Sequence, residues 1–126
     1  MTCEWLVLCH GVDPNPKHGG LTLIGVIGRL AVDAVPTKSP PIAAAFRILG
    51  DPNEEFRLQI DVEGPDGAPL LGSDVLSHRL PGYGAWDSWL VFRPIPLHTI
   101  GRYKFVLKLN LRSAATVLLP VEQFVH

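Results

Sequence analysis

Two stretches of the chain alternate between hydrophobic and polar residues, the first strictly and the second with one exception, Val106. From 56 to 63 every even-numbered position is apolar and every odd-numbered position is polar. Such alternation is typical of a β-strand with one buried face and one solvated face, because successive side chains of a strand point to opposite sides. From 102 to 109 every odd-numbered position is apolar. We therefore predict two half-buried strands, at 56–63 and 102–109.

Turn residues place further strands beside these two. The sequence Gly64-Pro65-Asp66-Gly67 combines a fixed backbone angle at proline with a glycine that accepts positive φ, so the chain should reverse there into Leu70 and Leu71. The β-branched stretch 116–121 should pair back on 102–109 after a turn at 110–113. Pro120 within it indicates an edge strand or a bulge.

The first half of the chain follows the same plan. Apolar stretches at 2–10 and 21–30 flank a loop rich in glycine and proline, and they should pair antiparallel. Three alanines leave a helix open at 42–49, but prolines before it and a Gly-Asp-Pro sequence after it favour a strand. A last strand is predicted at 86–92. About eight strands without an amphipathic helix indicate a single all-β domain over 1–126, an antiparallel β-sandwich.

Short motifs carry two resemblances. The segment 99–105, with Tyr103 entering a late strand, resembles the corner of immunoglobulin-like domains, where a tyrosine caps the connection between sheets. This resemblance implies an immunoglobulin-like or C2-like architecture. The opening apolar strand and the stretches 20–26, 63–67 and 101–105 make the chain similar to an uncharacterised bacterial family of short β-sandwich proteins, known only as a domain of unknown function. That resemblance implies an all-β bacterial protein without established catalytic residues.

Composition limits the function. Of the 126 residues 47% are hydrophobic and 18% are charged, which excludes disorder driven by charge. The net charge of −1 creates no field that would recruit nucleic acid or an anionic membrane, so neither is an expected partner. Low charge in a small domain indicates apolar surface hidden against a protein partner or a second subunit. The start of the chain shows no cationic leader and no apolar stretch spans a membrane, so we expect a cytoplasmic protein.

Neither the histidines nor the cysteines form a compact metal motif. His10, Asp13 and His18 bracket one loop and could in principle supply nitrogen and oxygen ligands, but their spacing matches no known pattern. Cys3 and Cys9 share one face of the first strand, too far apart for a disulfide, and are interpreted as small buried hydrophobic residues. We expect no metal and no cofactor.

One cluster raises the possibility of nucleophilic catalysis. Ser73, Asp74, Ser77 and His78 lie close in sequence, but neither serine sits in a G-x-S-x-G elbow. Ser77 and His78 would point to opposite faces of a strand. The expectation is that the chain is not an enzyme, and a hydrolase using His78 is kept as an alternative.

The stretch 81–89 concentrates aromatic residues beside glycines. Tyr83, Trp86 and Trp89 could bind a protein or stack on a sugar, since these side chains bury much area at low entropic cost. Trp86 and Trp89 differ in parity, so in a strand one of them should fill the core and the other should be partly exposed.

The predicted role is therefore interaction without catalysis. The stretch that contains Val117 and Leu118 is a candidate edge with little charge to protect it. The candidate interaction surface comprises Tyr83, Trp86, Trp89, Val117 and Leu118. The function predicted is a non-catalytic interaction module or a subunit of a homo- or hetero-oligomeric assembly. The alternatives are a small-ligand or carbohydrate-binding module that uses the aromatic loop, and an uncharacterised hydrolase.

Overall fold

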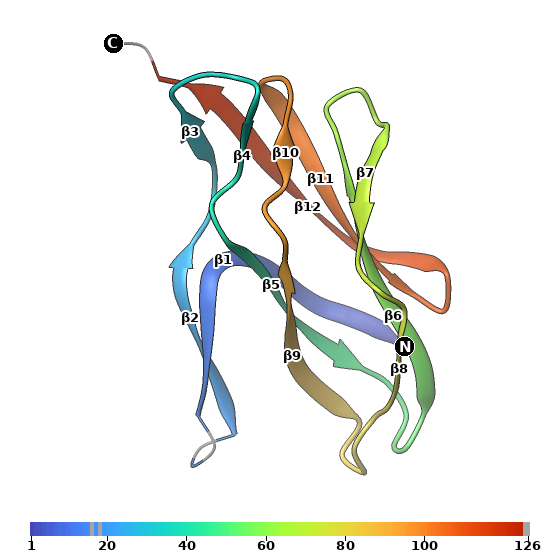
Figure 1. Cartoon of the computed structure of the whole chain (residues 1–126). Coiled ribbons are helices and arrows are strands. Elements are labelled where there is room, and N and C mark those ends of the chain that lie inside the picture. The colour runs from blue at the N-terminus through green and yellow to red at the C-terminus, as the bar shows by residue number, and fades with distance from the viewer. Residues whose placement is uncertain (16, 18, 125–126) are drawn as a thin grey trace.

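The chain folds into β-strands. The computed structural model describes residues 1–15, 17 and 19–124, and these residues contain twelve strands and no helix (Figure 1). The all-β class predicted from the alternating pattern is confirmed. In chain order the strands are β1 Thr2–Asn15, β2 Gly20–Val26, β3 Leu30–Val32, β4 Thr37–Lys38, β5 Ile42–Leu49, β6 Glu55–Glu63, β7 Pro69–Gly72, β8 Leu76–Arg79, β9 Ala85–Phe92, β10 Pro96–Leu97, β11 Gly101–Leu109 and β12 Arg112–Gln123.

Most strands belong to two larger sheets. The four-stranded sheet has the order β2-β1-β5-β9, and all its neighbours are antiparallel. The six-stranded sheet has the order β3-β12-β11-β6-β7, and β8 also pairs with β6. Its only parallel pair joins β3 to the end of β12. A short ladder of β4 and β10 makes a third, two-stranded sheet.

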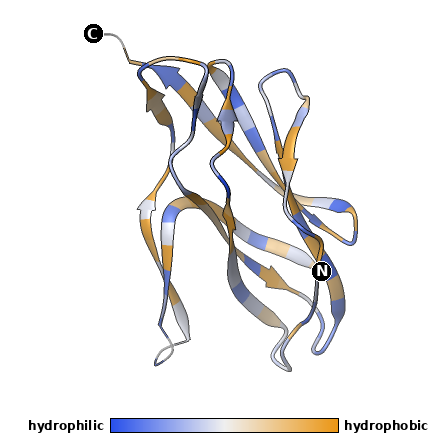
Figure 2. Cartoon of the chain, viewed as in Figure 1, coloured by the Kyte–Doolittle hydropathy of each residue, from blue (hydrophilic) through white to orange (hydrophobic). Residues whose placement is uncertain are grey.

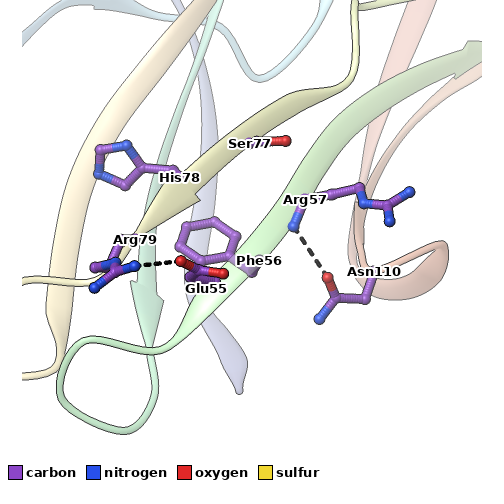
Figure 3. Close-up of a pocket in the computed structure, with 7 residues that line it drawn as sticks. All are labelled: Glu55, Phe56, Arg57, Ser77, His78, Arg79 and Asn110. Atoms are coloured by element: carbon purple, nitrogen blue, oxygen red, sulfur yellow. Dashed lines mark hydrogen bonds and ion pairs between the residues drawn. The ribbon is translucent and has the colours of Figure 1, made fainter.

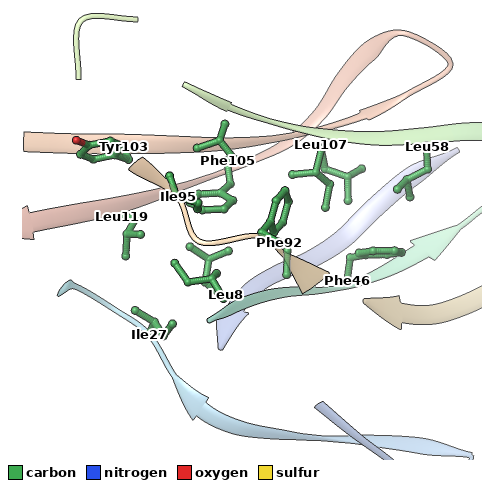
Figure 4. Packing of buried hydrophobic residues seen from close by; sticks show 14 of the residues in the cluster. Leu8, Ile27, Phe46, Leu58, Phe92, Ile95, Tyr103, Phe105, Leu107 and Leu119 are labelled. Carbon is green, nitrogen blue, oxygen red and sulfur yellow. The ribbon is translucent and has the colours of Figure 1, made fainter. Parts of the chain in front are cut away.

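The hydrophobic core gathers side chains from both larger sheets (Figure 4). Leu8 and Phe46 come from the four-stranded sheet, and Leu58 and Leu107 come from the six-stranded sheet; all four are almost completely buried. The rings of Phe92 in β9 and Phe105 in β11 meet edge to face, with centroids 5.4 Å apart. One core therefore holds the two sheets together, and it includes every apolar position that alternation marked at 56–62 and 103–109.

The strand count differs from the eight or so expected, because several strands are short. β3, β4, β8 and β10 have only two to four residues, which is too few for a periodic pattern to reveal. The prediction of one strand over 21–30 was wrong in extent: β2 ends at Val26, after Gly25 with a φ of 66°, and the chain then crosses to the six-stranded sheet as β3. The strand predicted at 42–49 is confirmed as β5.

The tyrosine contact suggested by 99–105 is present. Tyr103 lies at the start of β11 and is 2% exposed. Its hydroxyl donates a hydrogen bond to the backbone carbonyl of Thr99, with an O–O distance of 2.6 Å. This bond satisfies a buried phenol and fixes the corner by which the chain enters β11.

Candidate interaction surface

Strand register identifies the residues on the outer face of the four-stranded sheet, the face that points away from the core. Directly paired residues share a face, and faces alternate along each strand. One rung across the sheet is Val26, Cys9, Ala43 and Val91; the next is Val7, Ala45 and Trp89; the third is Trp5, Arg47 and Asp87. We call these ten residues the outer apolar face, because eight of them are hydrophobic.

The outer apolar face is exposed at its margins. Val26 in β2 is 64% exposed and Val91 in β9 is 71% exposed, whereas Cys9, Ala43 and Ala45 between them are buried. The two edge strands β2 and β9 approach each other to within 8 Å between Cα atoms. The sheet is therefore curled, so that the larger side chains at its edges shield the small residues along its centre.

An ion-pair cluster closes one end of this face. Arg47 lies between two carboxylates, with its Nε 3.0 Å from Glu4 and 3.7 Å from Asp87. All three side chains are partly exposed. The apolar rungs thus end at a small charged boundary, as the polar rim of a protein interface does.

The outer face of the six-stranded sheet is different in character. Its central strands place lysine, arginine and carboxylate side chains outward, and Figure 2 shows hydrophilic segments interleaved with hydrophobic ones along β11 and β12. Lys108 Nζ lies 2.8 Å from a carboxylate oxygen of Asp61. The hydrogen bond to Asp61 raises the pKa of Lys108. This is an ordinary solvated face, so the two outer faces of the molecule are chemically unlike.

The three aromatic residues of 81–89 do not share one surface. Tyr83 lies in the loop before β9 and is 80% exposed. Trp86 packs against the core, with its ring centroid 5.6 Å from Phe46 and 5.8 Å from Phe56. Trp89 pairs with Ala45 on the outer apolar face. The two tryptophans therefore lie on opposite faces of β9.

Ser77 and His78 also separate across a strand. His78 stacks on Trp86. Ser77 points to the side of β8 opposite His78 (Figure 3). A pocket of about 700 Å³ lies at this end of β6 and β8. Figure 3 shows the residues that line it. Within it Arg79 forms an ion pair with Glu55, and the backbone N–H of Arg57 donates to Asn110 Oδ1 at 3.0 Å.

Ser73 serves the backbone. Its hydroxyl oxygen accepts a hydrogen bond from the N–H of Ile60 at 2.8 Å and lies 3.1 Å from the carbonyl oxygen of Asp74, to which it donates. The serine therefore fastens the chain beyond β7 to β6. The described contacts give neither Ser73 nor Ser77 a histidine partner.

Val117 and Leu118 lie on opposite faces of β12. Val117 pairs with Phe105 and packs against the core, while Leu118 pairs with Lys104 and is 44% exposed on the polar outer face. On the side of β12 opposite β11, the one described strand that pairs with it is β3, which begins its pairing at Val121. The segment before Val121 is therefore an edge on that side.

The described candidates for metal ligation, His10 and Asp13, do not form a common site. His10 and Asp13 differ in parity on β1, and the ring of His10 lies 3.2 Å from the carbonyl oxygen of Pro41. His18 falls outside the described residues. Among the residues that are described, no group of three or more histidine, cysteine, aspartate or glutamate side chains is placed to hold a metal ion.

Both cysteines are free thiols. Cys9 is fully buried and Cys3 is partly buried. Burial raises the pKa of each thiol, because it disfavours the thiolate. Both residues thus fit their interpretation as small packing residues better than a reactive role. The prediction that they share one face was wrong, because a register shift between Cys3 and Trp5 turns Cys3 toward the core while Cys9 lies on the outer apolar face.

The interpretation of the sequence did not identify most of the outer apolar face, although continuous apolar segments indicate it. The segments Trp5–Cys9, Ile42–Phe46 and Trp89–Phe92 are almost wholly apolar rather than alternating. Continuous apolar runs are typical of strands that are buried on both faces. Because the core covers only one face of β1, β5 and β9, the runs point to a second face that needs cover.

Comparison with known proteins gives a family but no activity. No curated protein matches the chain. The solved structure of the Pseudomonas fluorescens alkylpurine DNA glycosylase AlkC, bound to DNA containing an abasic site analog, is similar with a TM-score of 0.53 and 9% identity. The match covers 93% of this chain but 30% of that one, so it concerns fold alone. Among the described residues there is no helix of the length and hydrophobicity that a membrane crossing requires. A family model described as "Family of unknown function (DUF6941)" matches residues 4–122, and the chain therefore belongs to that family.

Proposed function

We propose that this protein is an interaction module or assembly subunit that binds another protein chain through the outer apolar face. The observation that carries the proposal is the contrast between the two sheets. One outer face is charged and solvated, and the other has two wholly apolar rungs, one of which ends at Val26 and Val91, both well exposed. A contiguous apolar surface on a small domain marks a site of protein association.

The proposal includes an architecture. We infer that the two larger sheets form an immunoglobulin-like or C2-like sandwich, with Tyr103 as its corner residue. Such sandwiches serve as scaffolds for many functions, so the role depends on the surface and not on the fold. The two free thiols are consistent with a reducing compartment, which supports the expectation of a cytoplasmic protein.

The alternatives receive less support from the geometry. A carbohydrate module needs aromatic rings on one platform, but Trp86 and Trp89 lie on opposite faces of β9. A serine hydrolase needs a serine within reach of His78, whereas His78 stacks on Trp86 and the Ser73 hydroxyl is bonded to backbone. DNA appears in the name of the similar glycosylase structure, but this chain carries 11 basic and 12 acidic residues, which gives no cationic surface field.

The test compares substitutions on the two outer faces. V91K places a charge on the outer apolar face, and L118K does the same at an exposed leucine on the polar face. Self-association by sedimentation, and capture of protein by the tagged chain, should be lost in V91K and retained in L118K. Each variant should keep the near-ultraviolet circular dichroism of the native chain. Loss of association and capture in L118K alone would assign binding to β12 and overturn the proposal. The proposal would also be overturned if both variants associated and captured protein as the native chain does.

A further inference from the structure

The free edge of β9 is unusually unprotected. β9 pairs with β5 through eight consecutive residue pairs, and no described strand pairs with its other side. An edge strand presents backbone N–H and carbonyl groups that another strand can satisfy, and natural proteins usually block such edges with proline, bulges or charge. Over its eight residues β9 has no proline, no bulge against β5 and a single charged side chain, Asp87.

The other sheet edges are less suitable for pairing. β7 begins with Pro69 and has four residues, and β3 has three. β2 contains Gly25 with a φ of 66°, which bends its backbone. β12 has a longer edge before Val121, but that edge contains Pro120 and a register shift against β11. The longest edge without a proline or an irregularity among the described strands is therefore that of β9.

A groove accompanies this edge. It has a volume of about 440 Å³ and lies between β9 and the segment that joins β7 to β8. Leu90 and Phe92 line one wall, and Leu71 and Leu76 line the other. A strand added to β9 would therefore find hydrogen-bonding groups along its backbone. Side chains on its inner face would enter a groove that Ser73, Asp74 and Arg93 line together with the hydrophobic residues.

We propose that the occupant of this edge is β9 of a second copy of the chain, paired antiparallel about a two-fold axis. The proposal rests on the proposed function, because it names the partner and a contact at the margin of the outer apolar face. A two-fold axis perpendicular to the sheet keeps like faces together, so only registers that pair residues of the same parity are possible.

Charge selects one of these registers. If Leu90 lies on the axis, Asp87 of each copy stands opposite Arg93 of the other copy, so the dimer contains two such pairs. Arg93 directly follows β9, is exposed, and forms no ion pair with any residue that the structure describes. Opposite charges placed directly across neighbouring strands stabilise the pairing.

The same register also matches the apolar side chains. Trp89 then stands opposite Val91 of the second copy, an aromatic and β-branched pair that favours antiparallel strands. The neighbouring register, with Trp89 on the axis, would instead place the Asp87 carboxylate opposite Val91. The register centred on Leu90 is the one that pairs both the charges and the apolar residues.

Dimerisation in this way gives a continuous sheet of eight strands. The outer apolar faces of both copies join across the axis, so Val91 of each copy becomes buried beside Trp89 of the other. The contact removes the unprotected edge of β9 and joins the two outer apolar faces into one larger surface.

The first experiment measures association by sedimentation equilibrium from about 1 µM to about 1 mM. The native chain should dimerise. R93E should weaken the dimer about tenfold, because two attractive pairs become two repulsive ones. Adding D87K to R93E should restore dimerisation to within about threefold of the native chain. A chain that stays monomeric throughout, or a double variant as weak as R93E, would overturn the proposal.

The second experiment reads the register by oxidative cross-linking. L90C should form a covalent dimer, since the two copies of position 90 meet on the axis, whereas S88C should not. A dimer that cross-links through W89C instead would overturn the assigned register and with it the proposal. Wild-type chain controls for Cys3 and Cys9.

The outcomes separate this inference from the proposed function. If the native chain is monomeric but captures another protein that V91K no longer binds, the second copy is wrong while the interaction face stands. If V91K alters neither association nor capture, both fail.

Discussion

The imidazole of His78 lies flat against the indole of Trp86, with ring centroids 3.9 Å apart and 18° between the planes. His78 comes from β8 on the six-stranded sheet, and Trp86 comes from β9 on the four-stranded sheet. Phe56 completes the group, with its ring edge-on to His78. This stack bridges the two sheets beside the free edge of β9, and it accounts for the place of the one histidine that suggested catalysis.

Removing the stack should alter the environment of Trp86. We expect H78A to change the tryptophan fluorescence and to lower the free energy of unfolding by about 1 kcal/mol, the usual value of an aromatic pair beyond its area. S77A is the matched control, because Ser77 points to the side of β8 opposite His78. Indistinguishable spectra and stabilities for H78A and the native chain would contradict the stacking.

The two tryptophans of β9 should differ in their contribution to stability. W86A removes a ring that packs against Phe46 and Phe56, so it should cost about 3 kcal/mol in urea unfolding. W89A changes the outer apolar face and should cost about 1 kcal/mol when measured at concentrations where the chain is monomeric. Association, by contrast, should be weakened by W89A. A larger stability loss for W89A than for W86A would reverse the assigned faces.

The two tyrosines of the chain make a second matched pair. Y103F removes the hydroxyl that bonds the Thr99 carbonyl, and it should lower the free energy of unfolding by about 1 to 2 kcal/mol. Y83F removes a hydroxyl from an exposed loop residue and should leave stability unchanged. Equal effects in thermal unfolding would show that the corner bond contributes nothing.

Gly84 positions the start of β9. It has a φ of 74°, and a Cβ there would lie 2.5 Å from the backbone oxygen of Gly50. G84A should therefore destabilise the protein by about 3 kcal/mol, through both backbone strain and a contact that cannot relax. G82A is the control, since a Cβ at Gly82 meets no atom within 4 Å. Similar melting temperatures for the two variants would refute this role of Gly84.

Cys9 gives a pH dependence of known sign. Burial raises the pKa of its thiol above the ordinary value of 9.0, so the unfolded chain releases this proton more readily than the folded one. The stability that the neutral thiol contributes is present below pH 9 and declines as the pH rises through the raised pKa. Urea unfolding between about pH 8 and pH 10 should therefore show a steeper decline for the native chain than for C9A. Parallel declines would contradict the burial of this thiol.

The sequence predicts the regular strands well and the connections poorly. β6 and β11 each have one core face and one solvated face, so alternation alone located them to within a residue. The crossing of the chain after Val26 was missed, because the hydrophobicity of 21–30 continues while the backbone changes sheets at a positive φ. Hydrophobicity along a sequence predicts that a residue is buried, but it does not predict the sheet to which the residue belongs.

The candidate surface was only partly predictable for the same reason. Trp89 was identified from its residue type, but Val26 and Val91 join it only through the pairing register of β2, β1, β5 and β9. Trp86 is the same residue type as Trp89, but it packs against the core. The strand pairing shows which of the two tryptophans faces the core, and a single sequence does not reveal that pairing.

The central claim, that the protein acts through the outer apolar face beside the edge of β9, is tested most directly by amide hydrogen exchange of dilute and concentrated protein. We predict that amides of β9 exchange more slowly in the concentrated sample, that V91K abolishes this protection, and that β12 shows no such change. Protection that develops along β12, or β9 amides that exchange at the same rate in both samples, would contradict the account.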